Sequence, residues 1–489
     1  MPSFADTFKV GAPRPILKKN EMQMIHEAAL DVMKTVGIRV HSSIARAALK
    51  RAGADVNEKE HVVKFDQDLT KKLISSAPSR IVLAGRDKAF DLPMDGTHHY
   101  YTTDGTGITV WNQKTQSRRL SVLKDIRDTA IVSDWLPYLS IYEPMVVASD
   151  INEKIHVITG MREAFEVSRK HIESESTSTK EEALLQIEMA AEIVGSKAEL
   201  KKRPIISAMV CTMSPLTLDE HATDAGMIWA EAGIPVHITG MAMMGVSGPA
   251  TIAGDLVVNH AETLAMVASM QAHAKGSPAI YGSVLSSMDP RTGAYTAGSP
   301  ESVLLGCCSH EMAKFVNLPS SCGGIGPSTR TPGVQASLEN AQLSIMSASV
   351  AAEVMNGLGL VDGSTMLSYE QLMIDNEIAG RSIYCCRDIP VNKETIHLDL
   401  IKETNILGMG PKKGNYLYSP ATMKEARGFF QSTLFNTQPF DQWEAKGKKD
   451  DMTVAKEKAD WVLKNHKPDL LDKGIMKKLD DIIKKAGKA

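Results

Sequence analysis

The chain has 489 residues, with 55 Lys and Arg against 58 Asp and Glu, so its formal net charge is −3. A chain of this length can bury a large core without disulfides or metals, and 43% hydrophobic with 23% charged residues argues against disorder. The near-neutral balance also argues against a nucleic-acid-binding protein, which would present a basic face. Aromatic residues make up only 5%, so tyrosines near strand ends are informative.

The cysteines and the amino-terminal segment indicate a reducing compartment. Six cysteines include two adjacent pairs and no CxxC motif, which fits neither a zinc knuckle nor a disulfide framework. The first thirty residues interleave charges with isolated apolar residues, so no signal peptide is predicted. No apolar run is long enough to cross a bilayer. We expect a cytoplasmic protein that does not span a membrane.

Residues 1–135 are predicted to form an α+β extension that packs on the main domain. Helical spacing of apolar residues predicts helices over 21–35 and 42–51, with a short strand at "GIRVHS" between them. From 80 to 120 the pattern changes to short β-like runs separated by Gly and Asp.

Residues 136–404 alternate strand-like runs with long helices and form the predicted main domain. The strand-like runs span 138–148, 203–215, 234–245, 278–289, 318–330 and 359–366. Continuous apolar strands joined by helices are typical of a parallel sheet buried on both faces. An open doubly wound sheet and a closed (β/α)8 TIM barrel both fit. Because no strand leads into a GxGxxG or GxxxxGK[ST] motif, we favour the barrel.

Residues 405–489 are predicted to form a helical carboxyl-terminal tail. This segment carries an aromatic patch between 429 and 443, the run "KGKKDD" and lysine-rich amphipathic helices. We interpret its charge run as a solvated face, with a docking surface for a partner as the alternative.

Candidate functional residues follow the predicted strands, because barrel enzymes place their chemistry at the carboxyl ends of strands. Tyr142 with Glu143, and also His237, Tyr281 and Tyr295, lie on or after such ends. For the tyrosines the alternative is a core side chain whose hydroxyl is satisfied. For the histidine it is a hydrogen-bonded core residue.

Arg330 lies in the turn-rich loop "GPSTRTPG", where a guanidinium can hold a carboxylate through two parallel hydrogen bonds. The alternative is an exposed loop arginine. A zinc site would have to draw on Cys211, His237, His310 and Cys322, but no spacing between these residues in the sequence enforces the geometry of a zinc site. The sequence has no GxSxG motif, which would place a nucleophilic serine on a sharp turn after a strand.

Several ordered segments resemble the trimethylamine methyltransferase family. They are "IHEAALDVMKTVGIRVHS", "SVLKDIRDTAIVSDWLP", "MGVSGPATIAGDLVVNHAETLAMVASMQAHAKGSPAIYGS", "SPESVLLGCCSHEMAKFVNLPSSCGGIGPSTR" and "AAEVMNGLGLVDGSTMLSYEQLMIDNEI". The resemblance implies a (β/α)8 barrel whose mouth docks a corrinoid protein, with the methyl group passing to cob(I)alamin on that partner. Founding members carry pyrrolysine in the loop after the strand matching "SSCGGIG", whereas this chain has the standard residues 328–331 there.

Members without pyrrolysine act on quaternary amines, glycine betaine being the best-known type; proline betaine, carnitine and γ-butyrobetaine are related substrates. A quaternary ammonium leaves as a neutral amine, so the resemblance implies methyl transfer that needs neither an acid nor a metal. It implies anaerobic methylotrophy or methanogenesis, cobalamin supplied by the partner, and no nucleic acid. A homodimer is expected because large barrel enzymes commonly pair.

The resemblance assigns the candidate residues to a betaine. Tyr142, Tyr281 and Tyr295 would face the ammonium with Glu143 nearby, because rings and carboxylates attract cations. Arg330 would clamp the carboxylate, and His237 and His310 would lend hydrogen bonds. The alternatives are a zinc-dependent methyltransferase or hydrolase on a similar barrel, and a non-catalytic betaine-binding barrel.

Overall fold

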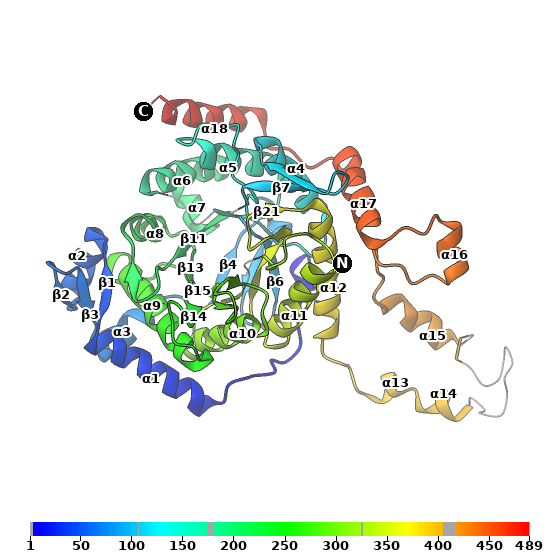
Figure 1. Cartoon of the computed structure of the whole chain (residues 1–489), viewed down its shortest axis with the longest axis horizontal. Coiled ribbons are helices and arrows are strands. Elements are labelled where there is room, and N and C mark those ends of the chain that lie inside the picture. The colour runs from blue at the N-terminus through cyan, green and yellow to red at the C-terminus, as the bar shows by residue number, and fades with distance from the viewer. Residues whose placement is uncertain are drawn as a thin grey trace.

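A closed barrel of eight parallel strands forms the centre of the computed structural model, which describes residues 3–105, 107–174, 179–323, 326–403, 416–417 and 419–488 (Figure 1). Around the barrel the strands are β6 (Tyr100–Thr103), β9 (Ile141–Tyr142), β10 (His171–Ser174), β11 (Ile206–Cys211), β13 (Val236–Gly240), β15 (Ala279–Ser283), β18 (Ser321–Cys322) and β19 (Val354–Leu358), which pairs with β6. The remaining seam closes where the Tyr281 amide donates to the Pro319 carbonyl at 2.8 Å. The predicted (β/α)8 barrel is confirmed.

Helices surround this barrel as its outer layer (Figure 1). They are α4 (Leu123–Trp135), α5 (His156–Val167), α6 (Lys180–Val194), α7 (Lys197–Lys202), α8 (Glu220–Ala232), α9 (Ile252–His273), α10 (Pro300–Phe315), α11 (Val334–Ser349) and α12 (Tyr369–Cys385). Side chains at their amino ends set where several begin: Asp219, Thr251 and Ser299 each accept an amide N–H from the first turn of α8, α9 and α10. Gly233 ends α8 in a left-handed conformation at φ 73°.

The barrel begins earlier in the chain than the expected boundary at residue 136. β6 and α4, both within 1–135, are its first strand and first helix. No strand was expected at β10. The last expected strand, 359–366, begins just after β19 ends. β6 and β10 read Tyr-Tyr-Thr-Thr and His-Ile-Glu-Ser, and all eight residues are buried. Their polar composition hides them from a search for apolar runs.

The amino-terminal extension is joined to the barrel through a shared sheet. Its helices are α1 (Lys19–Thr35), α2 (Ser43–Ala52) and α3 (Gln67–Ile74), and its strands are β1 (Ile38–Val40), β2 (Asp55–Asn57) and β3 (Val62–Lys64). β1 pairs in parallel with β12 (Thr217–Leu218), which belongs to the loop after β11. The Arg39 amide donates to the Leu216 carbonyl at 2.9 Å. A short strand from a barrel loop therefore completes the four-stranded sheet β12-β1-β3-β2 of the extension.

Short strands decorate the two ends of the barrel. They are β4 (Ile81–Leu83), β5 (Leu92–Met94), β7 (Thr109–Asn112), β8 (Ser117–Leu120), β14 (Met243–Met244), β16 (Ser286–Met288), β17 (Tyr295–Thr296), β20 (Leu360–Val361) and β21 (Met366–Leu367). β14, β16 and β17 form one small sheet, and β20, β21, β7 and β8 form another. Both sheets follow carboxyl ends of barrel strands and build the rim of the mouth.

The carboxyl-terminal segment leaves the barrel and then returns. α13 (Lys393–Ile396), α14 (Leu398–Glu403), α15 (Pro420–Glu425) and α16 (Phe440–Ala445) stand away from the body at the right of Figure 1. α17 (Asp451–Asn465) packs on α4 and α12, and α18 (Lys473–Ala486) packs on α5 and α6. The expected boundary at 404 lies outside the described residues. Nowhere in the described chain is a helix both long and apolar enough to traverse a bilayer.

A buried lysine fastens the base of the barrel. Lys170, just before β10, donates from Nζ to the carbonyl oxygens of Ser133, Leu136 and Leu139, each at 2.6 Å. Burial lowers the pKa of this ammonium to about 7.

Replacing this lysine should destabilise the fold. We expect Lys170→Met to lower the free energy of unfolding by about 2–4 kcal/mol, because three buried carbonyls lose their donor. Urea denaturation measures the change. The matched control is Lys180→Met, since Lys180 is exposed at the start of α6, and it should stay within about 0.5 kcal/mol of the parent. Equal midpoints for the two variants would contradict this role.

Candidate functional site

Alternation along each strand decides which side chains point into the barrel. A side chain at Gly282 would overlap the His237 ring and the Ser321 hydroxyl, so position 282 faces inward. Its neighbour Tyr281 therefore faces outward. On β13, a side chain at Gly240 would overlap Asn259 of α9, so Gly240 faces outward and His237 faces inward.

Two of the predicted ring partners lie on the wrong side of the barrel wall. The Tyr142 hydroxyl donates to the Ile126 carbonyl of α4 at 2.9 Å. The Tyr281 hydroxyl lies 2.8 Å from Nδ1 of His260 on α9. Burial raises the pKa of both phenols. These tyrosines fasten strands to the helix layer and do not reach the mouth, which corrects their assignment to a substrate site.

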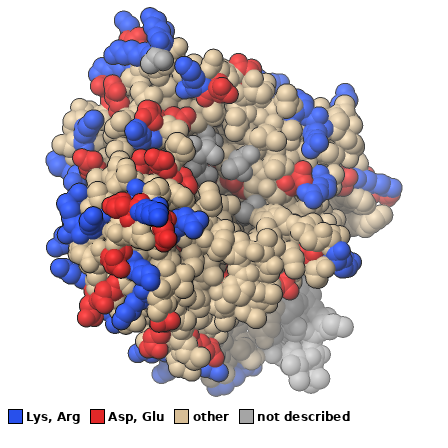
Figure 2. Space-filling model, turned by 60° about the vertical axis from the view of Figure 1, so that its left-hand side comes forward, with Lys and Arg blue, Asp and Glu red and all other residues tan. Residues whose placement is uncertain are grey.

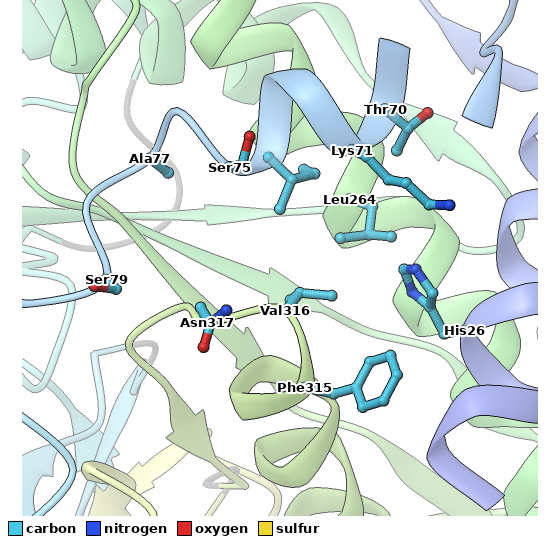
Figure 3. A pocket seen from close by; sticks show the side chains of 11 residues that line it. His26, Thr70, Lys71, Ser75, Ala77, Ser79, Leu264, Phe315, Val316 and Asn317 are labelled. Atoms are coloured by element: carbon cyan, nitrogen blue, oxygen red, sulfur yellow. The ribbon is translucent and has the colours of Figure 1, made fainter. Parts of the chain in front are cut away.

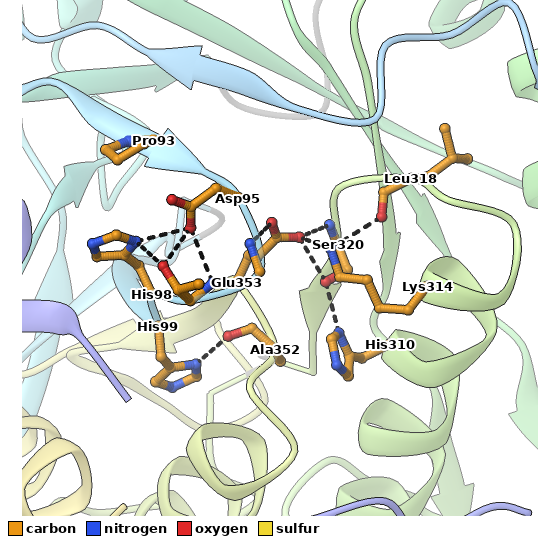
Figure 4. A network of polar contacts seen from close by, with 12 residues as sticks. Pro93, Asp95, His98, His99, His310, Lys314, Leu318, Ser320, Ala352 and Glu353 are labelled. Atoms are coloured by element: carbon orange, nitrogen blue, oxygen red, sulfur yellow. Dashed lines mark hydrogen bonds and ion pairs between the residues drawn. The ribbon is translucent and has the colours of Figure 1, made fainter. Parts of the chain in front are cut away.

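His310 also lies away from the mouth. Its Nδ1 is 2.7 Å from the Ser320 hydroxyl (Figure 4). Its Nε2 is 2.9 Å from the Val350 carbonyl. Ser320 and the adjoining Glu353 precede β18 and β19, so this network braces the amino ends of the strands. Burial lowers the pKa of His310 to about 3, so the ring is neutral at physiological pH. The assignment of His310 to the substrate site is corrected.

His237 belongs to a polar chain that crosses the barrel interior. Its Nδ1 lies 3.1 Å from Oε1 of Glu173 on β10, and its Nε2 hydrogen-bonds the Ser321 hydroxyl of β18. The order acid, histidine, serine is that of a nucleophilic triad, but all three side chains are buried. Burial opposes ionisation of Glu173, yet His237, His171 and Ser207 together hold its pKa below the ordinary value. This row of hydrogen-bonded side chains cross-links β10, β13 and β18 beneath the mouth.

Two carboxylates and a tyrosine gather at the mouth itself. Asp104 follows β6 and accepts hydrogen bonds from the Ser364 hydroxyl and from the Gly326 amide at 3.2 Å. A side chain at Gly105 would overlap the Glu143 carboxylate, so Glu143 lies against the residue next to Asp104. Burial, followed by the charge of Asp104, raises the pKa of Tyr295 and keeps its phenol neutral. Of the sequence-predicted residues, the structure brings together Glu143 and Tyr295.

Asp104 is a candidate functional residue that sequence reasoning missed. Burial raises its pKa to about 6, although hydrogen bonds from Ser364, Gly326 and Gly105 oppose the shift. Perturbed carboxyl groups at the carboxyl ends of barrel strands are typical of functional sites. The signal was present in "YYTTDGTG", where an Asp-Gly step follows four strand residues, but those residues were assigned to the extension.

Arg330 lies on the rim of the mouth, with 73% of its side chain exposed, and pairs with Asp362. Asp362 belongs to the loop that follows β19. The next residue in that loop, Gly363, lies beside the Tyr295 ring, so the ion pair is close to the groups at the mouth. Arg118 of β8 approaches the same Asp362 carboxylate at 4.0 Å. Arg330 is therefore near the gathered groups and open to solvent.

A cavity of about 430 Å³ lies outside the barrel wall, between α1, α3, α9 and the end of α10 (Figure 3). His26 on its wall hydrogen-bonds His260 at 2.9 Å, and His260 in turn reaches Tyr281. This cavity lies at the junction of the extension and the helix layer, and none of the mouth groups lines it.

Charged residues of both signs are mixed across the face shown in Figure 2, which is hollowed near its centre. Among the described residues, no three His, Cys, Asp or Glu side chains are grouped as metal ligands. In the described part of the chain, the polar side chains at the mouth include the Asp104 and Glu143 carboxylates, the Ser364 hydroxyl, the Tyr295 phenol and the Arg330 guanidinium.

Polar groups at the carboxyl ends of the strands of a closed (β/α)8 barrel are typical of barrel enzymes. The sequence model described as trimethylamine methyltransferase (MTTB) matches residues 7–489. The chain belongs to the trimethylamine methyltransferase family and is a methyltransferase.

Three similar proteins span nearly the whole chain. The trimethylamine methyltransferase MttB of Methanosarcina barkeri is 32% identical, covering 98% of this chain and 96% of the relative. MttB of Desulfitobacterium hafniense is 30% identical, covering 95% and 92%. A glycine betaine methyltransferase of Desulfitobacterium hafniense is 28% identical, covering 97% of both.

A solved structure supports the fold. The crystal structure of the Methanosarcina barkeri monomethylamine methyltransferase superposes with a TM-score of 0.51 at 13% identity, covering 98% of this chain and 97% of that chain.

Breaking the cross-barrel chain should destabilise the barrel. We expect His237→Ala to lower the free energy of unfolding by about 3–5 kcal/mol, because the buried Glu173 carboxylate loses its partner. Glu173→Gln should cost less, since a neutral amide needs no counter-charge. Chemical denaturation of both variants measures the difference, and a His237→Ala variant as stable as the parent would refute the cross-link.

Proposed function

We propose that this methyltransferase moves a methyl group from a small quaternary amine to the cob(I)alamin of a partner corrinoid protein. Glycine betaine is the favoured substrate, with proline betaine, carnitine and γ-butyrobetaine as alternatives. The observation that carries the proposal is the gathering of Asp104, Glu143 and Tyr295 at the mouth. The 28% identical glycine betaine methyltransferase supports the substrate class.

The gathered groups suit a cation that has no proton to donate. A quaternary ammonium offers no N–H, so recognition depends on charge and on aromatic faces. A ring contact contributes about 0.5–2 kcal/mol, and a buried carboxylate attracts a cation more strongly than the same group in water. Asp104 and Glu143 supply the charge, and the neutral phenol of Tyr295 supplies the ring.

Methyl transfer from such a substrate balances without a proton. The bond between nitrogen and the methyl carbon breaks, and its electron pair stays on nitrogen, which leaves as a neutral tertiary amine. Cob(I)alamin on the partner supplies the electron pair for the new bond. The tasks of this chain are to orient the N–CH3 bond toward the mouth and to exclude water.

The rim of the mouth supports the proposal of a protein partner. Ile108, Met213, Met241 and Val246 follow barrel strands β6, β11 and β13, and each leaves a large part of its side chain exposed. Adaptable Met side chains suit a docking surface. The cysteines are all free thiols, which supports the inference of a cytoplasmic location.

One assay tests the activity directly. Purified enzyme is mixed with cob(I)alamin and each of the four betaines or trimethylamine, and methylation of cobalt is followed by absorbance. We expect turnover with a betaine. Turnover with trimethylamine alone would overturn the substrate class, and no methylation with any amine would favour a binding protein.

The pH dependence should report Asp104. Below about pH 6 the Asp104 carboxyl is protonated and neutral, so it no longer attracts the ammonium, which has no titrating group of its own. We therefore expect kcat/KM to rise as the pH increases through about 6. Asp104→Asn should lower kcat/KM at pH 8 by about ten- to hundredfold and remove that rise. A parent-like profile in Asp104→Asn would exclude Asp104.

Arg330 is proposed to hold the substrate carboxylate. Arg330→Ala should raise KM for glycine betaine by about ten- to hundredfold, the value of a charge-assisted bidentate pair, and leave the unfolding midpoint unchanged because the side chain is exposed. The control is Arg118→Ala, which removes the other guanidinium near Asp362 and should keep the parent KM. An unchanged kcat/KM in Arg330→Ala would remove this residue from the site.

A further inference from the structure

The cavity at the junction of the extension and the helix layer is lined by residues of both (Figure 3). α1 and α3 of the extension supply His26 and Lys71, whereas α9 and the end of α10 supply Leu264 and Phe315. Its volume of about 430 Å³ lies within the range of sites that bind small molecules. The proposed methyl transfer assigns no role to these residues.

Apolar side chains supply much of the cavity wall. They are Ile74, Ala77, Leu264, Phe315 and Val316. The centroid of the Phe315 ring lies 5.3 Å from that of the His26 ring, and the two ring planes are inclined by 56°. An apolar body, above all one with an aromatic ring, would be removed from water against this wall and would meet a ring edge or face.

Positively charged and protonatable groups face the same cavity. Burial, followed by the charge of Lys71, lowers the pKa of His26, and Glu27 beside His26 opposes the shift. The Lys71 ammonium and the His26 ring are therefore close enough to interact. Within the part of the chain that the structure describes, no acidic side chain lines the cavity. An anion is the ligand that would satisfy both groups.

A row of three hydrogen-bonded rings holds His26 in place. Its Nδ1 lies 2.9 Å from Nε2 of His260, and Nδ1 of His260 lies 2.8 Å from the Tyr281 hydroxyl. Burial lowers the pKa of His260 to about 3, so this middle ring is neutral and offers one donor and one acceptor. Because His260 occupies Nδ1 of His26, Nε2 is the nitrogen available to a ligand. A side chain fixed in this way loses little freedom on binding.

We propose that this cavity binds a small carboxylate with an aromatic or other apolar body. The carboxylate accepts hydrogen bonds from the Lys71 ammonium and from Nε2–H of His26, and the apolar body lies against Phe315 and Leu264. Hydrogen bonds between charged groups are about twice as strong as neutral ones. Inorganic phosphate would leave the apolar wall uncovered, so an amphipathic acid fits better. Because the walls come from two parts of the chain, the ligand ties the extension to the helix layer.

Binding of para-fluorophenylacetate to the full-length protein tests the proposal, followed by broadening of the probe's fluorine NMR signal. We expect a Kd of about 0.1–1 mM, which is usual for a ligand of this size. The uncharged para-fluorophenylacetamide should bind about tenfold more weakly, because it lacks the charge of the carboxylate. Glycine betaine should leave the probe bound, since the proposed substrate site lies at the mouth.

Substitutions in the cavity wall test where the probe binds. Lys71→Met and His26→Leu should each weaken binding by about tenfold, and Ala77→Phe should abolish it by filling the cavity without changing its charge. The matched control is Lys72→Met, which removes the neighbouring charge on α3 that does not line the cavity, and it should keep the parent Kd.

The proposal is overturned by absence of probe binding, by equal binding of the acid and the amide, or by displacement of the probe by glycine betaine. Parent-like binding in Lys71→Met, His26→Leu or Ala77→Phe would overturn it as well. Circular dichroism of every variant shows that a loss of binding is not a loss of the fold. If Ala77→Phe does not fold, the comparison of Lys71→Met with Lys72→Met still decides the outcome.

Discussion

The direction in which each strand residue points fixes where chemistry can occur in this barrel. Parallel strands are buried on both faces, so neighbouring residues serve opposite purposes. Gly282 leaves space for the His237 ring inside, while Tyr281 meets His260 of the helix layer outside. A shift of one residue would exchange these roles. The hydrogen bonds across the barrel interior and the outward tyrosines both depend on this one alternation of inward and outward residues.

The barrel interior is polar where most enzymes of this shape are packed with branched aliphatic residues. Glu173, His237 and Ser321 satisfy one another across it, which limits the cost of burying a charge. At the mouth the balance differs, because the Asp104 carboxyl receives hydrogen bonds and still has a raised pKa. The hydrogen bonds to Asp104 therefore do not fully offset the cost of burying its negative charge, and a bound cation would supply the remaining stabilisation.

The sequence was sufficient for the architecture and for part of the mouth. Apolar strands separated by capped helices predicted the barrel, and Glu143 and Tyr295 lie where barrel logic puts them. It was not sufficient for β6 and β10, whose Thr, His and Glu residues do not form an apolar run. Nor could it assign Tyr142, Tyr281 or His310, because inward and outward residues look alike in a strand covered on both sides. Asp104 was missed as a consequence of misplacing β6.

The shared sheet between β1 and β12 makes the extension a mechanical part of the mouth. Met213 on the rim pairs with Thr217 through two backbone hydrogen bonds of 2.9 and 3.1 Å, and Thr217 pairs with Arg39 of the extension. The backbone ladder therefore runs unbroken from the rim at Met213 to the extension at Arg39. Removing the extension would release the loop after β11 from its only described sheet partner outside the barrel.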